Sequence, residues 1–111
     1  MFSASSATVT NESSQANNVT QVEGKQVIEI TAKGGYSPNR SVAKANVPTV
    51  LKVRTKGTFD CSAALKSPAV GYNKILPASA DTLIEIPPQK SGAVVQGLCA
   101  MGMYSFQLHF N

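Results

Sequence analysis

The sequence YSFQLHF at residues 104–110 decides the fold class, because an aromatic or aliphatic residue occupies every second position. A period of two is typical of a β-strand with one buried face and one solvated face. The apolar positions are Tyr104, Phe106, Leu108 and Phe110. His109, the only histidine of the chain, falls on the polar face, so we expect it at the surface.

The alternation recurs towards the N-terminus. Predicted strands cover residues 27–32, 47–55, 81–86 and 93–98, with a short candidate at 41–45. In the first of them Ile28, Ile30 and Ala32 are expected to face the core. Pro48 indicates a strand start or an edge. No ten-residue window shows capped helical periodicity, although residues 61–66 could form one turn of helix. Short strands separated by Gly- and Pro-containing turns predict an all-β sandwich or barrel.

Length and composition limit the function classes. The 111 residues allow one domain, and the charged fraction of 14% is low for a soluble domain. The net charge of +4 is spread along the chain, and no run of basic residues is interleaved with aromatics, so the sequence does not support a nucleic-acid groove. Six acidic residues without paired spacing, and no catalytic motif, predict that the protein is not an enzyme.

The N-terminal part differs from the rest in composition. Residues 1–25 are mostly Ser, Thr, Asn, Gln and Ala, and we interpret them as a flexible polar tether before a domain at residues 26–111. No apolar stretch is long enough to span a bilayer, and Ser3 to Ser6 replace the apolar region of a signal peptide. The protein is therefore expected to be cytosolic, or the soluble part of a protein whose anchor is missing from this chain.

Three sulfur side chains lie at every second position of the sequence CAMGM at residues 99–103. In an extended segment Cys99, Met101 and Met103 would leave the same face and could converge, and Gly102 would let the backbone bend. A thiolate with two thioethers is a soft donor set, which favours Cu(I) over zinc. The alternative interpretation is a buried cysteine beside two methionines that fill the core.

Cys61 is the second cysteine, and it follows a predicted strand in a loop. It could join Cys99 in a metal site, or the two could form a disulfide, as an even cysteine count in an exported domain permits. Both interpretations place the cysteines close together, so only their oxidation state distinguishes them. A type 1 copper site needs two imidazoles and one thiolate, and one histidine cannot supply them.

Four sequence features together resemble a known family. They are GYSP at residues 35–38, Cys61, IEIP at residues 84–87 and CAMGMY at residues 99–104. This pattern resembles the cupredoxin-like domains of bacterial copper-handling proteins. These include membrane-anchored Cu(I) chaperones with a Cys-x-Met-x-Met loop and the N-terminal domain of copper-exporting P-type ATPases. The resemblance covers residues 26–111 and implies a cupredoxin-like Greek-key β-sandwich. Ala100 stands where related sequences often have glycine, which affects loop flexibility rather than ligand identity.

The resemblance also implies roles for the four sulfur residues. Cys61 takes the place of the first histidine ligand of electron-transfer cupredoxins, and Cys99 matches their cysteine. Met101 lies in the loop that carries their second histidine, and Met103 adds a further thioether. The family's chaperones hold two Cu(I) ions bridged by the cysteines, which implies up to two ions here.

The implied function is that of a Cu(I)-binding chaperone or metal-binding domain in copper resistance. It would exchange copper with a copper-exporting P-type ATPase at the bacterial cell envelope. There it would act as a monomeric, soluble domain of a membrane-anchored protein. Two alternatives remain, an electron-transfer cupredoxin and a structural β-sandwich with a disulfide and no metal.

Overall fold

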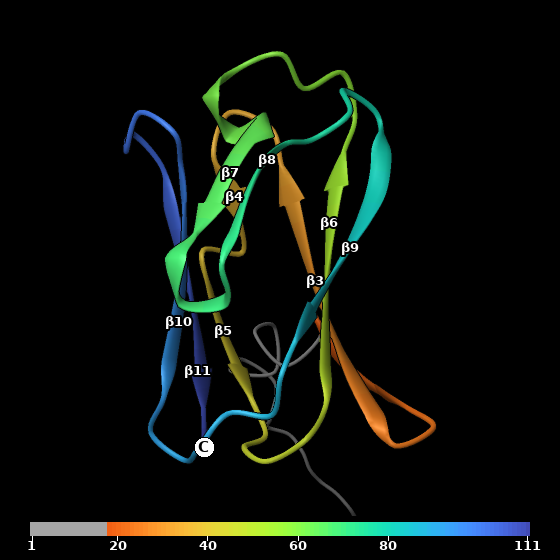
Figure 1. The fold of residues 1–111 in the computed structure, drawn as a ribbon. Helices are drawn as coiled ribbons and strands as arrows, with labels where there is room; N and C mark the ends of the chain where they lie inside the picture. The colour runs from red at the N-terminus through yellow and green to blue at the C-terminus, as the bar shows by residue number, and fades with distance from the viewer. Residues whose placement is uncertain (1–17) are drawn as a thin grey trace, which may run out of the picture.

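In the computed structural model, residues 18–111 are described, and they form two facing β-sheets (Figure 1). The only helices in this part of the chain are two single turns of 3-10 helix, and neither is long and apolar enough to cross a membrane. The all-β sandwich predicted from the alternation is confirmed. Residues 1–17, which make up most of the predicted tether, lie outside the described residues.

The first sheet is built on the long strands of the N-terminal half. In spatial order it contains β2 (Val19–Val22), β3 (Lys25–Ala32), β6 (Thr49–Thr55) and β9 (Ala80–Ile86), and β4 (Tyr36–Ser37) pairs with the end of β3. The pair β3–β6 is parallel and the other pairs are antiparallel. Because β9 pairs only with β6, it forms one edge of this sheet.

The second sheet carries both cysteine-bearing segments. Its order is β5 (Arg40–Ala43), β11 (Ser105–Phe110), β10 (Val94–Cys99), β7 (Ala64–Ser67) and β8 (Tyr72–Ile75). The two 3-10 turns, η1 (Cys61–Ala63) and η2 (Pro68–Val70), precede and follow β7. Strands β5 and β11 are parallel, and the rest of the sheet is antiparallel.

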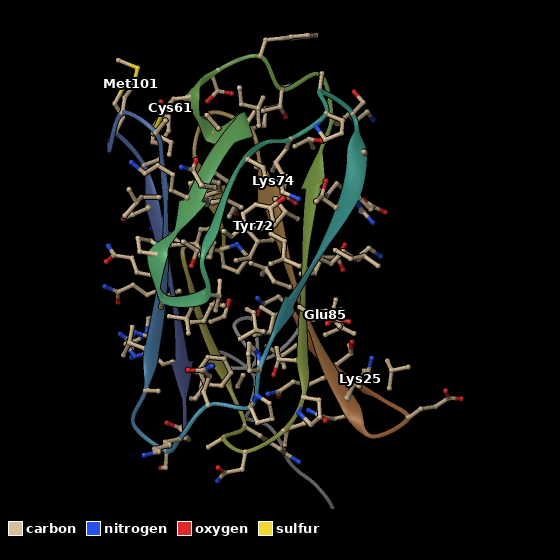
Figure 2. The ribbon with its side chains drawn as sticks, in the orientation of Figure 1. Lys25, Cys61, Tyr72, Lys74, Glu85 and Met101 are labelled. Atoms are coloured by element: carbon tan, nitrogen blue, oxygen red, sulfur yellow. A yellow bond between two sulfur atoms is a disulfide. The ribbon has the colours of Figure 1, made fainter. Side chains whose placement is uncertain are left out.

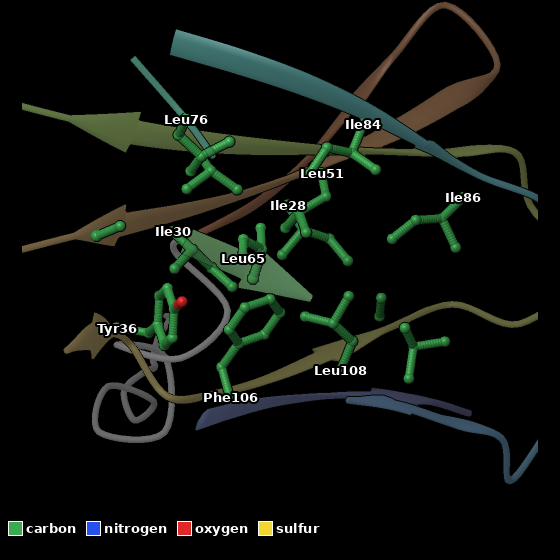
Figure 3. Close-up of a cluster of buried hydrophobic side chains, with 14 of the residues drawn as sticks. Ile28, Ile30, Tyr36, Leu51, Leu65, Leu76, Ile84, Ile86, Phe106 and Leu108 are labelled. Carbon is green, nitrogen blue, oxygen red and sulfur yellow. The ribbon is translucent and has the colours of Figure 1, made fainter. Parts of the chain in front are cut away.

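The core lies between the sheets and consists mainly of the inward residues of the other strands, with none from β2 or β8 fully buried, as Figure 3 shows. Ile28 and Ile30 of β3 are fully buried, as the alternation predicted. Phe106 and Leu108 of β11 meet them from the other sheet. Roughly 1.5–3 kcal/mol of hydrophobic stabilisation accompanies full burial of each such side chain, so this layer fixes the two sheets together.

The structure differs from the sequence-based prediction at three strands. Strand β2 lies within residues 1–25, where the sequence predicted the tether, and its residues are mostly exposed. Strand β7 begins at Ala64, so the helical turn predicted for residues 61–66 ends at Ala63. Strand β8 is an exposed edge strand that pairs only with β7. Strands β2 and β8 bury little, so they lack the apolar alternation that reveals a strand in a sequence.

Candidate metal centre

Cys61 and Cys99 lie side by side and form a disulfide, with their Cα atoms 5.5 Å apart. The disulfide that the sequence left open as an alternative is therefore present. Cys99 ends β10 and is completely buried, whereas Cys61 begins η1 and is only half-buried. In this state neither sulfur is a thiolate, so both would have to be reduced before they could bind a metal ion as thiolates.

Asp60, the residue before Cys61, is held by hydrogen bonds to Ser62 and Gly34. It caps η1, because its carboxylate accepts the backbone N–H of Ser62 at 3.2 Å. The same carboxylate accepts the backbone N–H of Gly34 at 3.2 Å and the hydroxyl of Ser62 at 2.9 Å. Local desolvation raises the pKa of the Asp60 carboxylate, but these hydrogen bonds outweigh it and leave the pKa below its ordinary value. The carboxylate thus stays ionised and ties η1 to the loop after β3.

Tyr36 holds Ser62, the residue that follows Cys61. Its hydroxyl donates to the backbone carbonyl of Ser62 at 3.0 Å, in a buried position. Its ring packs edge-on against Phe106, with ring centroids 4.9 Å apart. Burial, with a smaller contribution from the charge of Asp60, raises the pKa of Tyr36 to about 12. The residues on either side of Cys61 are therefore held by groups other than its sulfur.

The CAMGM sequence does not continue as an extended strand. Strand β10 ends at Cys99, and the N–H of Gly102 donates to the carbonyl of Cys99 at 2.8 Å. Gly102 has φ +73°, a left-handed conformation that glycine adopts without a steric penalty. The chain therefore turns over before β11, and the period of two that the sequence predicted for the three sulfur residues ends at Cys99.

Met101 and Met103 are exposed on this turn, at 77% and 64% of their surface. Figure 2 shows Met101 at the same end of the sandwich as Cys61. The methionines are not core residues, so the interpretation that they fill the core is wrong. An exposed methionine gains little from burial, so packing does not explain why two of them follow the buried Cys99.

The donor chemistry at this end suits a soft ion. Within residues 18–111, no three His, Cys, Asp or Glu side chains lie together as a group that could hold a metal. Two cysteine sulfurs and two thioethers on the adjacent turn are the donors that Cu(I) prefers, so the residues fit that ion after reduction of the disulfide. His109 lies near the C-terminal end of β11, where its Nε2 is 3.0 Å from the Oε1 of Gln107.

Asp60, Ser62 and Tyr36 are the supporting residues that the sequence analysis missed. Asp60 and Ser62 flank Cys61 directly, and an Asp two positions before a Ser is a local capping pattern that a sequence can show. Tyr36 is 26 residues away from its partner Ser62, and no sequence pattern predicts that contact.

Comparisons with known proteins support the fold. The profile of the cupredoxin-like domain family matches residues 2–107. A comparison with curated protein sequences found no match.

Two solved structures are similar over most of their length. The first is a copper-binding protein solved by NMR in the apo form, with a TM-score of 0.75 and 26% sequence identity. The match covers 84% of this chain and 94% of that protein. The second is the metal-binding domain of the Streptococcus pneumoniae Cu(I)-exporting P-type ATPase CopA, solved with Cu(I). Its TM-score is 0.74 at 19% identity, covering 84% of this chain and 92% of that domain, and this likeness is one of fold.

Proposed function

This chain belongs to the cupredoxin-like domain family, and we propose that it is a Cu(I)-binding member that carries copper and passes it on. The single observation that carries the proposal is the exposure of Met101 and Met103 on the turn that follows Cys99, at the end where Cys61 also lies. The similar copper-binding protein, at 26% identity, supports copper as the ion.

The four sulfurs divide the work by charge. In the reduced protein Cys61 and Cys99 supply anionic thiolates, which bind most strongly and can bridge two ions. The thioethers of Met101 and Met103 are neutral, exposed and weaker ligands. Replacing imidazole by sulfur stabilises Cu(I) over Cu(II), which suits carriage of the ion rather than reversible electron transfer.

The recipient in this proposal is a copper-exporting P-type ATPase at the bacterial cell envelope. The resemblance of the CAMGMY pattern to copper chaperones supports it, and a domain of one such ATPase shares the fold. Exposed thioethers help release, because an incoming donor can replace them without unfolding the domain. The role is binding and transfer, without catalysis.

A structural β-sandwich is the competing function, and the Cys61–Cys99 disulfide favours it. In that case the bond would serve stability, and the exposed methionines would have no function. Copper titration of the methionine variants distinguishes the two functions, because in a structural sandwich Met101→Leu and Met103→Leu would leave the Cu(I) affinity of the reduced protein unchanged.

The test is a Cu(I) titration of the reduced protein against a Cu(I) chelator, with zinc as competitor. We expect Cu(I) to bind far more tightly than zinc, and Cys61→Ser or Cys99→Ser to lose most of the affinity. Displacement of copper by an equal concentration of zinc would contradict the soft-site proposal. Full copper binding by either cysteine variant would contradict the assigned ligands.

A further inference from the structure

The two cysteines of the disulfide differ in exposure: Cys61 is partly exposed to solvent and Cys99 is buried. Cys99 lies in the core with no exposed surface, between β7 and β11. Cys61 keeps part of its surface exposed at the end of the sandwich, where Figure 2 places it beside the Met101 turn. A thiolate that opens a disulfide must reach one of its two sulfurs, and access decides which one it attacks.

The segments that carry the two cysteines are joined by bonds that do not involve sulfur. The N–H of Ala100 donates to the carbonyl of Ala64 at 2.8 Å, which links the residue after Cys99 to the residue after η1. Cys99 also pairs with Leu65 in the β10–β7 ladder. Together with the Asp60 cap, these bonds hold the two backbones in place, so opening the disulfide leaves the cysteines adjacent.

We infer that Cys61 is a site of thiol–disulfide exchange, and that this exchange controls whether the protein can accept copper. A thiolate of a small thiol attacks the Sγ of Cys61 and forms a mixed disulfide there. The Cys61–Cys99 bond breaks, and its electron pair leaves with Cys99 as a thiolate. A second thiol attacks the small-thiol sulfur and releases Cys61. Two thiols thus become one small disulfide, and the protein gains two thiols.

The consequence for copper rests on the proposed function. The disulfide has no thiolate to offer, so of the four sulfurs at this end of the sandwich only the two thioethers of Met101 and Met103 remain as soft donors in the oxidised protein. The reduced protein presents two adjacent thiols without rearrangement of the sandwich. The redox state of the surrounding thiol pool would then set the fraction of protein that can be loaded.

The first test locates the exchange. The parent protein in its disulfide form is mixed with limiting reduced glutathione, quenched with acid and digested, and the glutathione-bearing peptide is identified by mass. We expect the adduct on Cys61. An adduct on Cys99, or equal amounts on both, would overturn the inference.

Single-cysteine variants give an independent rate for each position. The folded Cys99→Ser and Cys61→Ser proteins react with oxidised glutathione, and intact mass follows the mixed disulfide. Cys61 should react at least about tenfold faster than Cys99 in the folded proteins, and at a similar rate in guanidinium. Equal rates in the folded state would contradict the inference, and circular dichroism verifies that both variants are folded.

The second test addresses the control of copper binding. Cu(I) titrations of the parent are run in the disulfide and reduced forms, without free thiol. We expect at least about tenfold weaker binding by the disulfide form. Equal, tight binding by both forms would overturn the control and leave the proposed function intact. Failure of both forms to bind would overturn the proposed function and the control together, while the adduct on Cys61 would remain a separate result.

Discussion

The hydroxyl of Tyr36 donates a hydrogen bond to the backbone carbonyl of Ser62 at 3.0 Å and so joins β4 to the turn that begins with Cys61. The bond connects residues 26 positions apart and is buried. Since the Tyr36 ring also packs on Phe106, one side chain links both sheets to the candidate site. Much of the geometry of the site therefore rests on a residue that is not a ligand.

Replacing Tyr36 by Phe tests this link. The substitution keeps the ring and leaves the buried carbonyl of Ser62 without its donor, so we expect a loss of about 1–3 kcal/mol in the free energy of unfolding. Denaturant titration measures it. A change below about 0.5 kcal/mol would show that the bond does not hold η1 in place.

The raised pKa of Tyr36 makes the stability of the fold depend on pH in the alkaline range. Burial first, and the charge of Asp60 second, raise the pKa of Tyr36 to about 12, from about 10 when unfolded. Between these values the unfolded chain loses a proton that the folded protein keeps, so stability falls as pH rises. The Tyr36 contribution to the slope is at most about 1.4 kcal/mol per pH unit, and below pH 10 it vanishes. In Tyr36→Phe the fall should be shallower, and identical slopes would contradict this pKa.

A larger residue at Gly97 should disturb the packing of the β10–β11 hairpin, which carries the candidate site. An added Cβ at this position would meet the ring of Phe106, which is buried against Tyr36 and pairs with Gly97 across β10 and β11. Gly97→Ala should therefore cost about 1–3 kcal/mol, as overpacked cores do. Thermal unfolding checks this, with Gly92→Ala as a contrasting control, since nothing lies within 4 Å of its added Cβ and only its φ of +91° opposes the change. A neutral Gly97→Ala would mean that the ring moves aside freely.

Reduction of the disulfide should weaken the protein without unfolding it. The bond closes a loop with a sequence separation of 38 residues, for which chain entropy gives a stabilisation of about 4 kcal/mol as an upper value. The hydrogen bonds between Ala100 and Ala64 and around Asp60 remain after reduction. We expect an unchanged far-UV circular dichroism spectrum and a lower midpoint of thermal unfolding. Loss of the β-sheet spectrum on reduction would contradict the expectation that the cysteines stay adjacent.

The methionines should affect copper affinity and leave stability almost unchanged. Met101 and Met103 are exposed, so Met101→Leu and Met103→Leu should change the free energy of unfolding by less than about 0.5 kcal/mol. Each should weaken Cu(I) binding in part, because one thioether is lost while the thiolates remain. Parallel copper and thermal titrations measure both quantities.

Leu83 offers a matched control for the methionine variants. It is exposed to the same extent as Met103, at 64%, but lies on the outer face of β9. Leu83→Met makes the reverse exchange away from the site and should leave copper affinity unchanged. Parent-like copper binding by both Met→Leu variants, or a gain in affinity from Leu83→Met, would contradict the assigned ligands.

The parts of the fold that the sequence predicted are those with one buried and one solvated face. Ile28 and Ile30 alternate with polar residues, as do Phe106 and Leu108. This alternation predicts that they are buried, and the structure confirms it. Strands β2 and β8 are mostly exposed, so their existence depends on pairing with a distant neighbour rather than on their own pattern.

In the candidate site, the closeness of the two cysteines was predictable from the sequence, but the geometry of the turn that carries the methionines was not. The sequence predicted that Cys61 and Cys99 lie close together, and they do. It could not predict their disulfide, because oxidation state depends on the environment as well as on proximity. Nor could it predict that Met101 and Met103 are exposed on a turn. The expectation that they share a face with Cys99 assumed an extended segment, and the turn at Gly102 ends that extended conformation.

X-ray absorption at the copper edge of the reduced, Cu(I)-loaded protein tests the central claim most directly. We predict a Cu(I) edge with sulfur neighbours alone, and fewer sulfur neighbours in the Met101→Leu/Met103→Leu double variant. A shell that contains nitrogen or oxygen ligands, or one that is unchanged in the double variant, would contradict a site made of Cys61, Cys99, Met101 and Met103.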